Sequence, residues 1–197
     1  MSDSLVRCRS IAGDGSYLTV TATVRPRDGR AEVKCSVPDA PSVAQRMQEV
    51  VRLARHTEAR FDSRAQVVLS LDRAPAAGER DWELAAVLAD RMVRGLYQSP
   101  VPVVANGWSD AWHLGRVDGH GLAAVPLGVL AGGEGGLPHL GALSGHPDPA
   151  VGVASSRTWF PLVSGAEGGS LSWVEVHVRP GQADGGDEES RIVARGV

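Results

Sequence analysis

The spacing of apolar residues changes once within the first 55 residues, and this change limits the folds open to the chain. Apolar side chains alternate with polar ones over residues 18–24 and again over residues 31–37. This period of two is typical of strands with one buried face. From residue 43 the apolar side chains recur at helical spacing instead. The switch predicts a sheet followed directly by a covering helix, which places the chain in the α/β (α+β) class.

Two Asp-Gly pairs divide this N-terminal region into three strands. Asp14-Gly15 and Asp28-Gly29 stand between the alternating segments, and Asp-Gly is a strong signal for a tight hairpin. We therefore expect the first 37 residues to form a three-strand antiparallel meander.

The elements after the meander continue the alternation of helix and strand. A helix is expected after residue 41, and residues 65–71 (AQVVLSL) have the short, apolar, β-branched composition of a buried strand. A second helix is predicted from about Asp81 to Arg94, with Gly95 as its stop. The predicted order up to residue 96 is thus β-β-β-α-β-α, with further strands over residues 101–104 and 111–117.

Glycine and acidic residues mark the later part of the chain. Residues 128–149 contain many glycines, including four in the run 132–136, and predict a long loop or a poorly formed helix. Beyond Pro180 the sequence GQADGGDEES is acidic and polar, as in disordered tails. We expect one domain over residues 1–179 and a disordered tail over residues 180–197.

The charge balance and the cysteines restrict the setting in which the protein works. A net charge of −3 argues against a nucleic-acid partner, although arginines gather between Arg46 and Arg80. That gathering predicts either a local basic patch or a solvated helix face. No apolar run is long enough for a membrane helix, and the N-terminus lacks a leader-like apolar core. We expect a cytoplasmic protein with no membrane contact, in which Cys8 and Cys35 are free thiols.

Several short motifs occur in an order that is shared with one known family. Val37-Pro38-Asp39 leads into an arginine-bearing helix, and the strand VVLSL follows. The segment GERDWEL then opens the second helix, and residues 112–119 (WHLGRVDG) come next. Over about residues 4–122 this run resembles the N-terminal Lon-protease-like domain of magnesium-chelatase-related ATPases of the competence type. In that family an L-P-D turn starts the first helix, a K-E-G-S-x-x-D-L loop starts the second, and F-L-G-E-L…D-G forms a later strand and turn.

The resemblance implies a fold and exposes two departures. The family domain shares its fold with the Lon proteolytic domain and with domain 2 of ribosomal protein S5, so we expect the same fold here. No AAA+ ATPase module follows in this sequence, and the loop motif matches only with a one-residue gap, which puts Glu83-Leu84 at the family's D-L position.

The resemblance also assigns the positions of a serine–lysine dyad, and both are vacant. The serine would lie near Arg80 or Asp81, and neither is a serine. The lysine would lie downstream, but Lys34 is the only lysine in the chain, and an arginine stays protonated and cannot act as the base. The same lysine count removes a Walker A loop, so no cofactor is expected.

Without this chemistry we predict a non-catalytic domain that serves as a protein-interaction or regulatory module. The resemblance suggests an AAA+ ATPase as its partner, and a homo-oligomeric scaffold is an alternative. We expect partner contacts from Trp108, Trp112, Arg80 and Trp82, because tryptophan and arginine are enriched at binding hot spots; packing of the core is the other explanation for the tryptophans.

A second hypothesis treats the chain as an enzyme. It places an unrecognised hydrolase or metal-dependent site in the histidine- and glycine-rich segment 113–148. His139, His146 and Asp148 lie close together there and are the weak candidates for metal ligands, although scattered surface histidines are far commoner than such sites.

Overall fold

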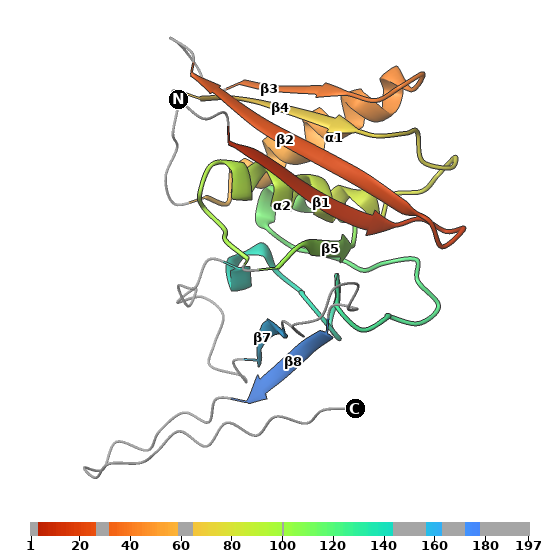
Figure 1. Cartoon of the computed structure of the whole chain (residues 1–197), viewed down its shortest axis with the longest axis vertical. Coiled ribbons are helices and arrows are strands. Elements are labelled where there is room, and N and C mark those ends of the chain that lie inside the picture. The colour runs from red at the N-terminus through yellow and green to blue at the C-terminus, as the bar shows by residue number, and fades with distance from the viewer. Residues whose placement is uncertain are drawn as a thin grey trace, which may run out of the picture.

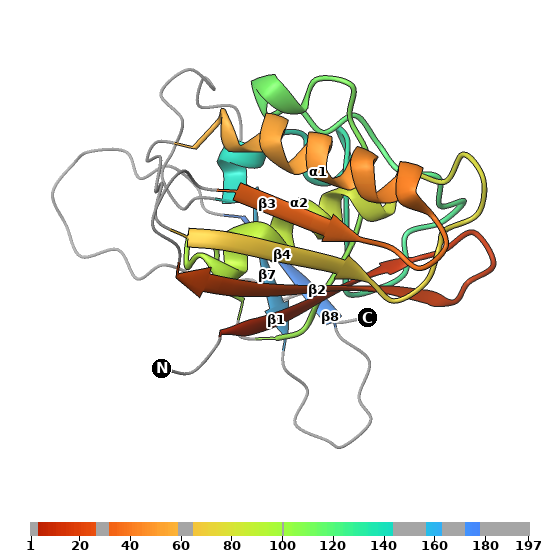
Figure 2. The same cartoon turned by 90° about the horizontal axis from the view of Figure 1, so that it is seen from above.

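The computed structural model shows a six-stranded mixed sheet with two helices packed against one of its faces (Figures 1 and 2). It describes residues 4–26, 32–58, 65–99, 101–143, 157–162 and 172–177. The predicted tail over residues 180–197 lies outside these residues. None of the helices in the described segments is long and apolar enough to cross a membrane.

The strands of the main sheet follow the order β3-β4-β2-β1-β5-β6. They are β1 (Leu5–Ile11), β2 (Tyr17–Pro26), β3 (Glu32–Ser36), β4 (Ala65–Leu71), β5 (Val103–Asn106) and β6 (Val129–Ala131). A separate two-stranded antiparallel sheet pairs β7 (Arg157–Leu162) with β8 (Ser172–His177).

The two helices lie close to the residue ranges that the sequence predicts. They are α1 (Pro41–Arg55) and α2 (Trp82–Val93), so the order β-β-β-α-β-α over the first 96 residues is confirmed. Gly95 ends α2 with a φ of +75°, and the Leu96 amide donates to the Arg91 carbonyl, as in a glycine-terminated helix. The side chains of α2 are buried almost all round, because the helix packs against the sheet and against α1.

The predicted three-strand meander is wrong in its third strand. β1 and β2 pair antiparallel, but β4 lies beside β2, and β3 pairs in parallel with β4 at the edge of the sheet. The reason is that α1 connects β3 to β4, and a helical crossover is the connection that parallel neighbours require. Burial acts in the same direction: Leu69 on β4 is fully buried and suits an inner strand, whereas Cys35, its partner in register on β3, is only partly buried.

The prediction of a strand over residues 111–117 is also wrong. A short 3₁₀ helix, Trp112–Leu114, replaces it and ends at Gly115 with a φ of +80°. Trp112 is fully buried, so this turn inserts an indole into the core instead of extending the sheet.

The described part of the glycine-rich segment, residues 128–143, is built from short regular pieces. β6 is followed by a tight turn and by a second 3₁₀ helix, Leu140–Leu143. The glycines permit close approaches: a Cβ on Gly136 would lie 2.0 Å from the Ala131 carbonyl oxygen, and one on Gly132 would lie 2.4 Å from Val117. Packing therefore requires glycine at positions 132 and 136.

Candidate functional site

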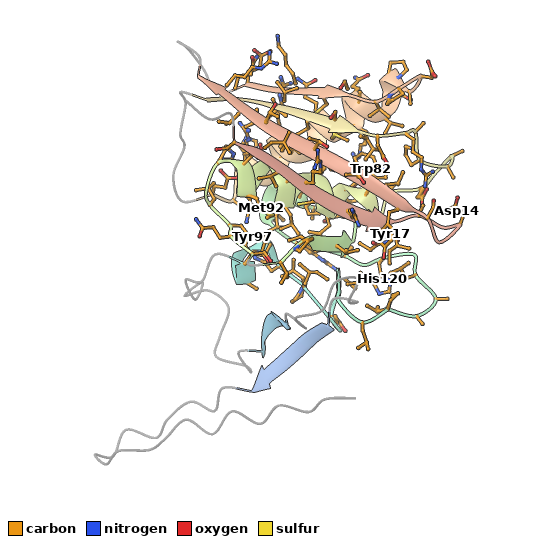
Figure 3. All side chains as sticks on the ribbon, viewed as in Figure 1. Asp14, Tyr17, Trp82, Met92, Tyr97 and His120 are labelled. Carbon is orange, nitrogen blue, oxygen red and sulfur yellow. The ribbon has the colours of Figure 1, made fainter. Side chains whose placement is uncertain are left out.

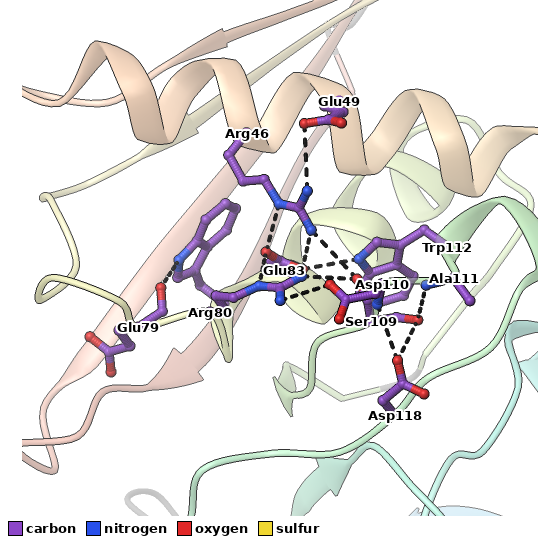
Figure 4. Close-up of polar contacts among 11 residues, drawn as sticks. Arg46, Glu49, Glu79, Arg80, Glu83, Ser109, Asp110, Ala111, Trp112 and Asp118 are labelled. Carbon is purple, nitrogen blue, oxygen red and sulfur yellow. Dashed lines mark hydrogen bonds and ion pairs between the residues drawn. The ribbon is translucent and has the colours of Figure 1, made fainter.

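The N-terminal end of α2 carries a charged cluster built around Glu83 (Figure 4). Glu83 has no exposed surface. Its Oε1 accepts hydrogen bonds from Arg46 Nε at 3.0 Å and Arg80 Nε at 2.9 Å, and its Oε2 accepts one from Trp112 Nε1 at 3.0 Å. A lone buried carboxylate is strongly unfavourable, and these donors offset its loss of hydration.

Arg80 links this cluster to the loop that follows β5. Its guanidinium also donates to Asp110 Oδ1 at 2.9 Å and to the Ser109 carbonyl at 3.0 Å. It lies 4.8 Å from the centroid of the Trp108 ring, within range of a cation–π contact. The hydrogen bond to Glu83 raises the pKa of Arg80, against the opposing effect of partial burial. The arginine therefore fixes the loop while staying charged.

A shallow hollow lies beside the cluster, between the first turns of α1 and α2. It is lined by Ser42, Val43, Arg46, Gly78, Glu79, Arg80, Trp82 and Glu83. The Trp82 indole donates to the Glu79 carbonyl at 2.8 Å, which fixes the orientation of the ring. The side chains of Arg46 and Arg80 are each 32% exposed. Two guanidinium groups thus line the hollow, and most of their N–H donors are already engaged in hydrogen bonds.

Asp81 is one of the two residues, with Arg80, near which the resemblance would place a nucleophile. Its carboxylate is buried, and both oxygens accept the Gly121 amide, at 2.9 and 2.8 Å. Asn106 Nδ2 donates to Oδ2 at 3.2 Å. Lys34 is exposed on β3 and points away from the helices, because its neighbour Val33 faces them. The Asp81 carboxylate therefore fastens the loop that begins at Gly121.

The four residues expected to contact a partner come together in this region. Arg80 and Trp112 bind Glu83, Trp108 lies beneath Arg80, and Trp82 lines the hollow. Trp82 and Trp112 are 2% and 0% exposed, so these two rings are part of the core. Trp108 is the partly exposed one of the set.

Sequence reasoning missed Glu83 and Arg46, which form the centre of the cluster. A signal for them exists: Glu83 and Asp90 are seven residues apart and so lie on the same face of α2. Arg46 and Arg55 on α1 bind these two acids. Two acids at helical spacing on an otherwise apolar helix, near a helix carrying arginines, predict paired buried charges.

The second acid forms its own network at the other end of the helices. Asp90 binds Arg55 at 2.6 Å and Arg94 at 2.5 Å, and Arg94 binds Glu58 at 2.5 Å. These side chains are all less than 10% exposed. The network joins the C-terminal ends of α1 and α2.

His139, one of the weak metal candidates, has both ring nitrogens engaged. Its Nε2 lies 2.8 Å from the Leu114 carbonyl, and its Nδ1 accepts the Gly141 amide at 3.0 Å. The other two candidates, His146 and Asp148, lie outside the described residues. Within the described segments, no three His, Cys, Asp or Glu side chains gather at metal-binding distances.

No protein-family model matches the sequence, and no curated protein is significantly similar to it. Function is therefore inferred from the chemistry of the described residues.

Proposed function

We propose that the chain is a non-catalytic Lon-like domain, with the fold of domain 2 of ribosomal protein S5, that serves as a protein-interaction or regulatory module. The observation that carries this proposal is the state of Asp81. The resemblance would place the nucleophile near Arg80 or Asp81, and the Asp81 carboxylate already accepts hydrogen bonds from Gly121 and Asn106. A group held in this way is unsuited to attack a substrate.

The order of elements and the packing of both helices on one sheet face support the Lon-like fold. The charged cluster supports the loss of catalysis, because Arg46, Arg80 and Glu83 fill the end of α2 with mutually bound side chains. The two cysteines are free, which suits the reducing cytoplasm.

An exposed uncharged loop supports the binding role. Residues 119–133 include no Asp, Glu, Lys or Arg, and Val125 and Leu127 are 46% and 70% exposed. The Val129 amide bonds the Pro126 carbonyl across a turn in which Gly128 has a φ of +83°, so Leu127 lies at the tip. Asp81 holds the other end of the loop at Gly121. A fixed apolar tip loses little freedom on binding and suits a protein partner.

The test is affinity purification of the tagged full chain from its native host at native expression levels. We expect the wild-type chain to recover an AAA+ ATPase and the Leu127→Asp variant to lose it. Leu96→Asp is the matched control, since Leu96 is 42% exposed after the end of α2 and should leave recovery unchanged. Purified wild-type chain should also leave an unfolded casein substrate intact.

Two results would contradict the proposal. One is peptide cleavage by the purified chain. The other is the absence of any ATPase whose recovery depends on Leu127.

A further inference from the structure

The basic side chains of the chain divide sharply into paired and unpaired ones. Those on the helices and loops form ion pairs, with one exception: Arg46, Arg55, Arg73, Arg80, Arg91, Arg94 and Arg116 each contact an acid. Among the described side chains, the basic ones without an acidic partner within 4 Å are Arg7, Arg9, Arg25, Lys34 and Arg52. All but Arg52 lie on the strands of the main sheet.

These four side chains share one face of the sheet. Cys8 and Ser10 on β1 are fully buried toward the helices, so the alternate residues Arg7 and Arg9 point to the opposite, outer face. The same alternation places Arg25 of β2 and Lys34 of β3 on this face. Figures 1 and 2 show both helices on the inner side of the sheet, and no described helix covers the outer side.

Side chains with hydroxyl groups lie between the basic residues. Arg7 pairs in register with Thr21, which continues to Ser70 and Ser36 on the neighbouring strands. Arg9 pairs with Thr19 one row away. Successive rows along a strand are about 6.8 Å apart, and four strands span about 14 Å. The outer face is thus mostly polar and carries four cationic groups, although Leu5 and Val68 also lie on it, in one row with Thr23 and Lys34.

The charge of this face opposes that of the whole chain. The acids on it are Glu32, which accepts from Gln66, and Asp72, which accepts the Thr19 amide. Among the described side chains of this face, four basic against two acidic ones give +2, while the full chain carries −3. Of the arginines between Arg46 and Arg80 that the structure describes, all but Arg52 form ion pairs.

An aromatic ring stands at one corner of the same face. Tyr17, which begins β2, is 51% exposed (Figure 3). The Arg9 guanidinium lies 5.5 Å from its ring centroid. The exposed ring provides a stacking surface next to a guanidinium group that can donate hydrogen bonds to a phosphate.

We propose that the outer face of the β1-β2-β4-β3 sheet binds single-stranded nucleic acid through its phosphates, without sequence preference. Guanidinium forks and hydroxyls match phosphate oxygens, and an exposed ring accepts a base by stacking. An acidic peptide would use the charges but leave Tyr17 without a role, so the observations favour the nucleic acid. The net charge of the whole chain does not oppose this binding, because the local field at the face decides it.

The test is fluorescence anisotropy of the full chain with a fluorescein-labelled oligo(dT) of about 20 nucleotides, over a range of salt concentrations. We expect Arg7→Ala to weaken binding and to reduce the slope of log K against log salt by about 0.7. Tyr17→Ala should weaken binding about fivefold or more. Arg52→Ala removes an equally unpaired, exposed arginine from α1 and should leave both quantities unchanged.

Three outcomes would overturn the proposal. The first is no binding of the oligonucleotide at low salt, and the second is an effect of Arg52→Ala equal to that of Arg7→Ala. The third is displacement of the probe by poly-glutamate at equal charge, together with unchanged oligonucleotide affinity in Tyr17→Ala. The last would assign the face to an acidic polypeptide. Circular dichroism and thermal melts show whether each variant is folded, and Arg25→Ala and Lys34→Ala repeat the test independently. Because Leu127 lies on a separate loop, failure here leaves the partner experiment intact.

Discussion

At the residue scale, the molecule is organised by how each buried charge finds its partners. Glu83 and Asp90 face α1 from α2, and each is bound by an arginine of α1 and another that is close to it along the chain. Asp81, two residues before Glu83, instead accepts hydrogen bonds from the Gly121 backbone amide and the Asn106 side-chain amide. Two buried carboxylates within α2 are thus bound by arginines, and a third, just before its first residue, is bound by amide groups.

Replacing Glu83 with alanine should be strongly destabilising, because two partly buried guanidinium groups and the Trp112 indole would lose their acceptor. We expect the free energy of unfolding to fall by about 3–5 kcal/mol in urea denaturation. Asp110→Ala removes an ion pair with the same Arg80, but Asp110 is 76% exposed, so a loss within about 1 kcal/mol is expected. Equal losses for the two variants would contradict a central role for Glu83.

The two thiols, Cys8 buried and Cys35 partly buried, predict a pH dependence. Burial raises the pKa of Cys8 to about 12 and that of Cys35 to about 12, whereas an unfolded thiol titrates near ~8.5. Their contribution to stability is therefore fully present below the unfolded pKa and is lost as the pH rises toward 12. Urea midpoints should fall over this alkaline range, and the fall should be shallower in Cys8→Ala. If the urea midpoint of Cys8→Ala fell with pH as steeply as that of the wild type, Cys8 would not contribute to the pH dependence.

At the element scale, short connections decide the geometry as much as the strands and helices do. α2 ends at a glycine that the sequence marks clearly, and β1 and β2 join at the predicted Asp14-Gly15 turn. The turn after β6 is ambiguous in the sequence, because a glycine run is typical both of a loose loop and of a tightly packed turn. Contacts to Ala131 and Val117 show that it is the second.

The glycine run offers a matched pair of substitutions. Gly136→Ala would place a Cβ 2.0 Å from a backbone oxygen, whereas Gly135→Ala meets nothing within 4 Å. We expect Gly136→Ala to lower the free energy of unfolding by about 1–3 kcal/mol or more and Gly135→Ala to change it by about 0.5 kcal/mol at most. Thermal melts of the two variants make the comparison, and similar melting temperatures would show that the turn is loose.

At the scale of the whole molecule, Asn106 joins the later segments to the N-terminal strands. β5 and β1 share two register pairs, Cys8 with Val103 and Arg9 with Val104. Beyond them the Asn106 side chain takes over the pairing: its Nδ2 donates to the Ile11 carbonyl at 2.7 Å, and its Oδ1 accepts the Ile11 amide at 2.8 Å. The side chain substitutes for a strand backbone.

Asn106→Leu should loosen this junction, because it leaves the polar groups of Ile11 and Asp81 short of partners. We expect the free energy of unfolding to fall by at least about 2 kcal/mol and amide exchange to accelerate between residues 103 and 121. Ser10→Ala, which removes only the hydroxyl bond to Asn106 Oδ1, should cost about 1 kcal/mol. Exchange rates that stay unchanged in Asn106→Leu would exclude this role.

The sequence by itself determined the order and extent of the first six elements, since the period of apolar residues directly records which side of each segment is buried. It also determined the absence of a lysine base, which is a matter of composition. The tertiary structure alone decided that β4 lies between β2 and β3, that Glu83 gathers Arg46 and Arg80, and that the unpaired basic side chains share one face. These features depend on contacts between residues far apart along the chain, and no local period carries that information.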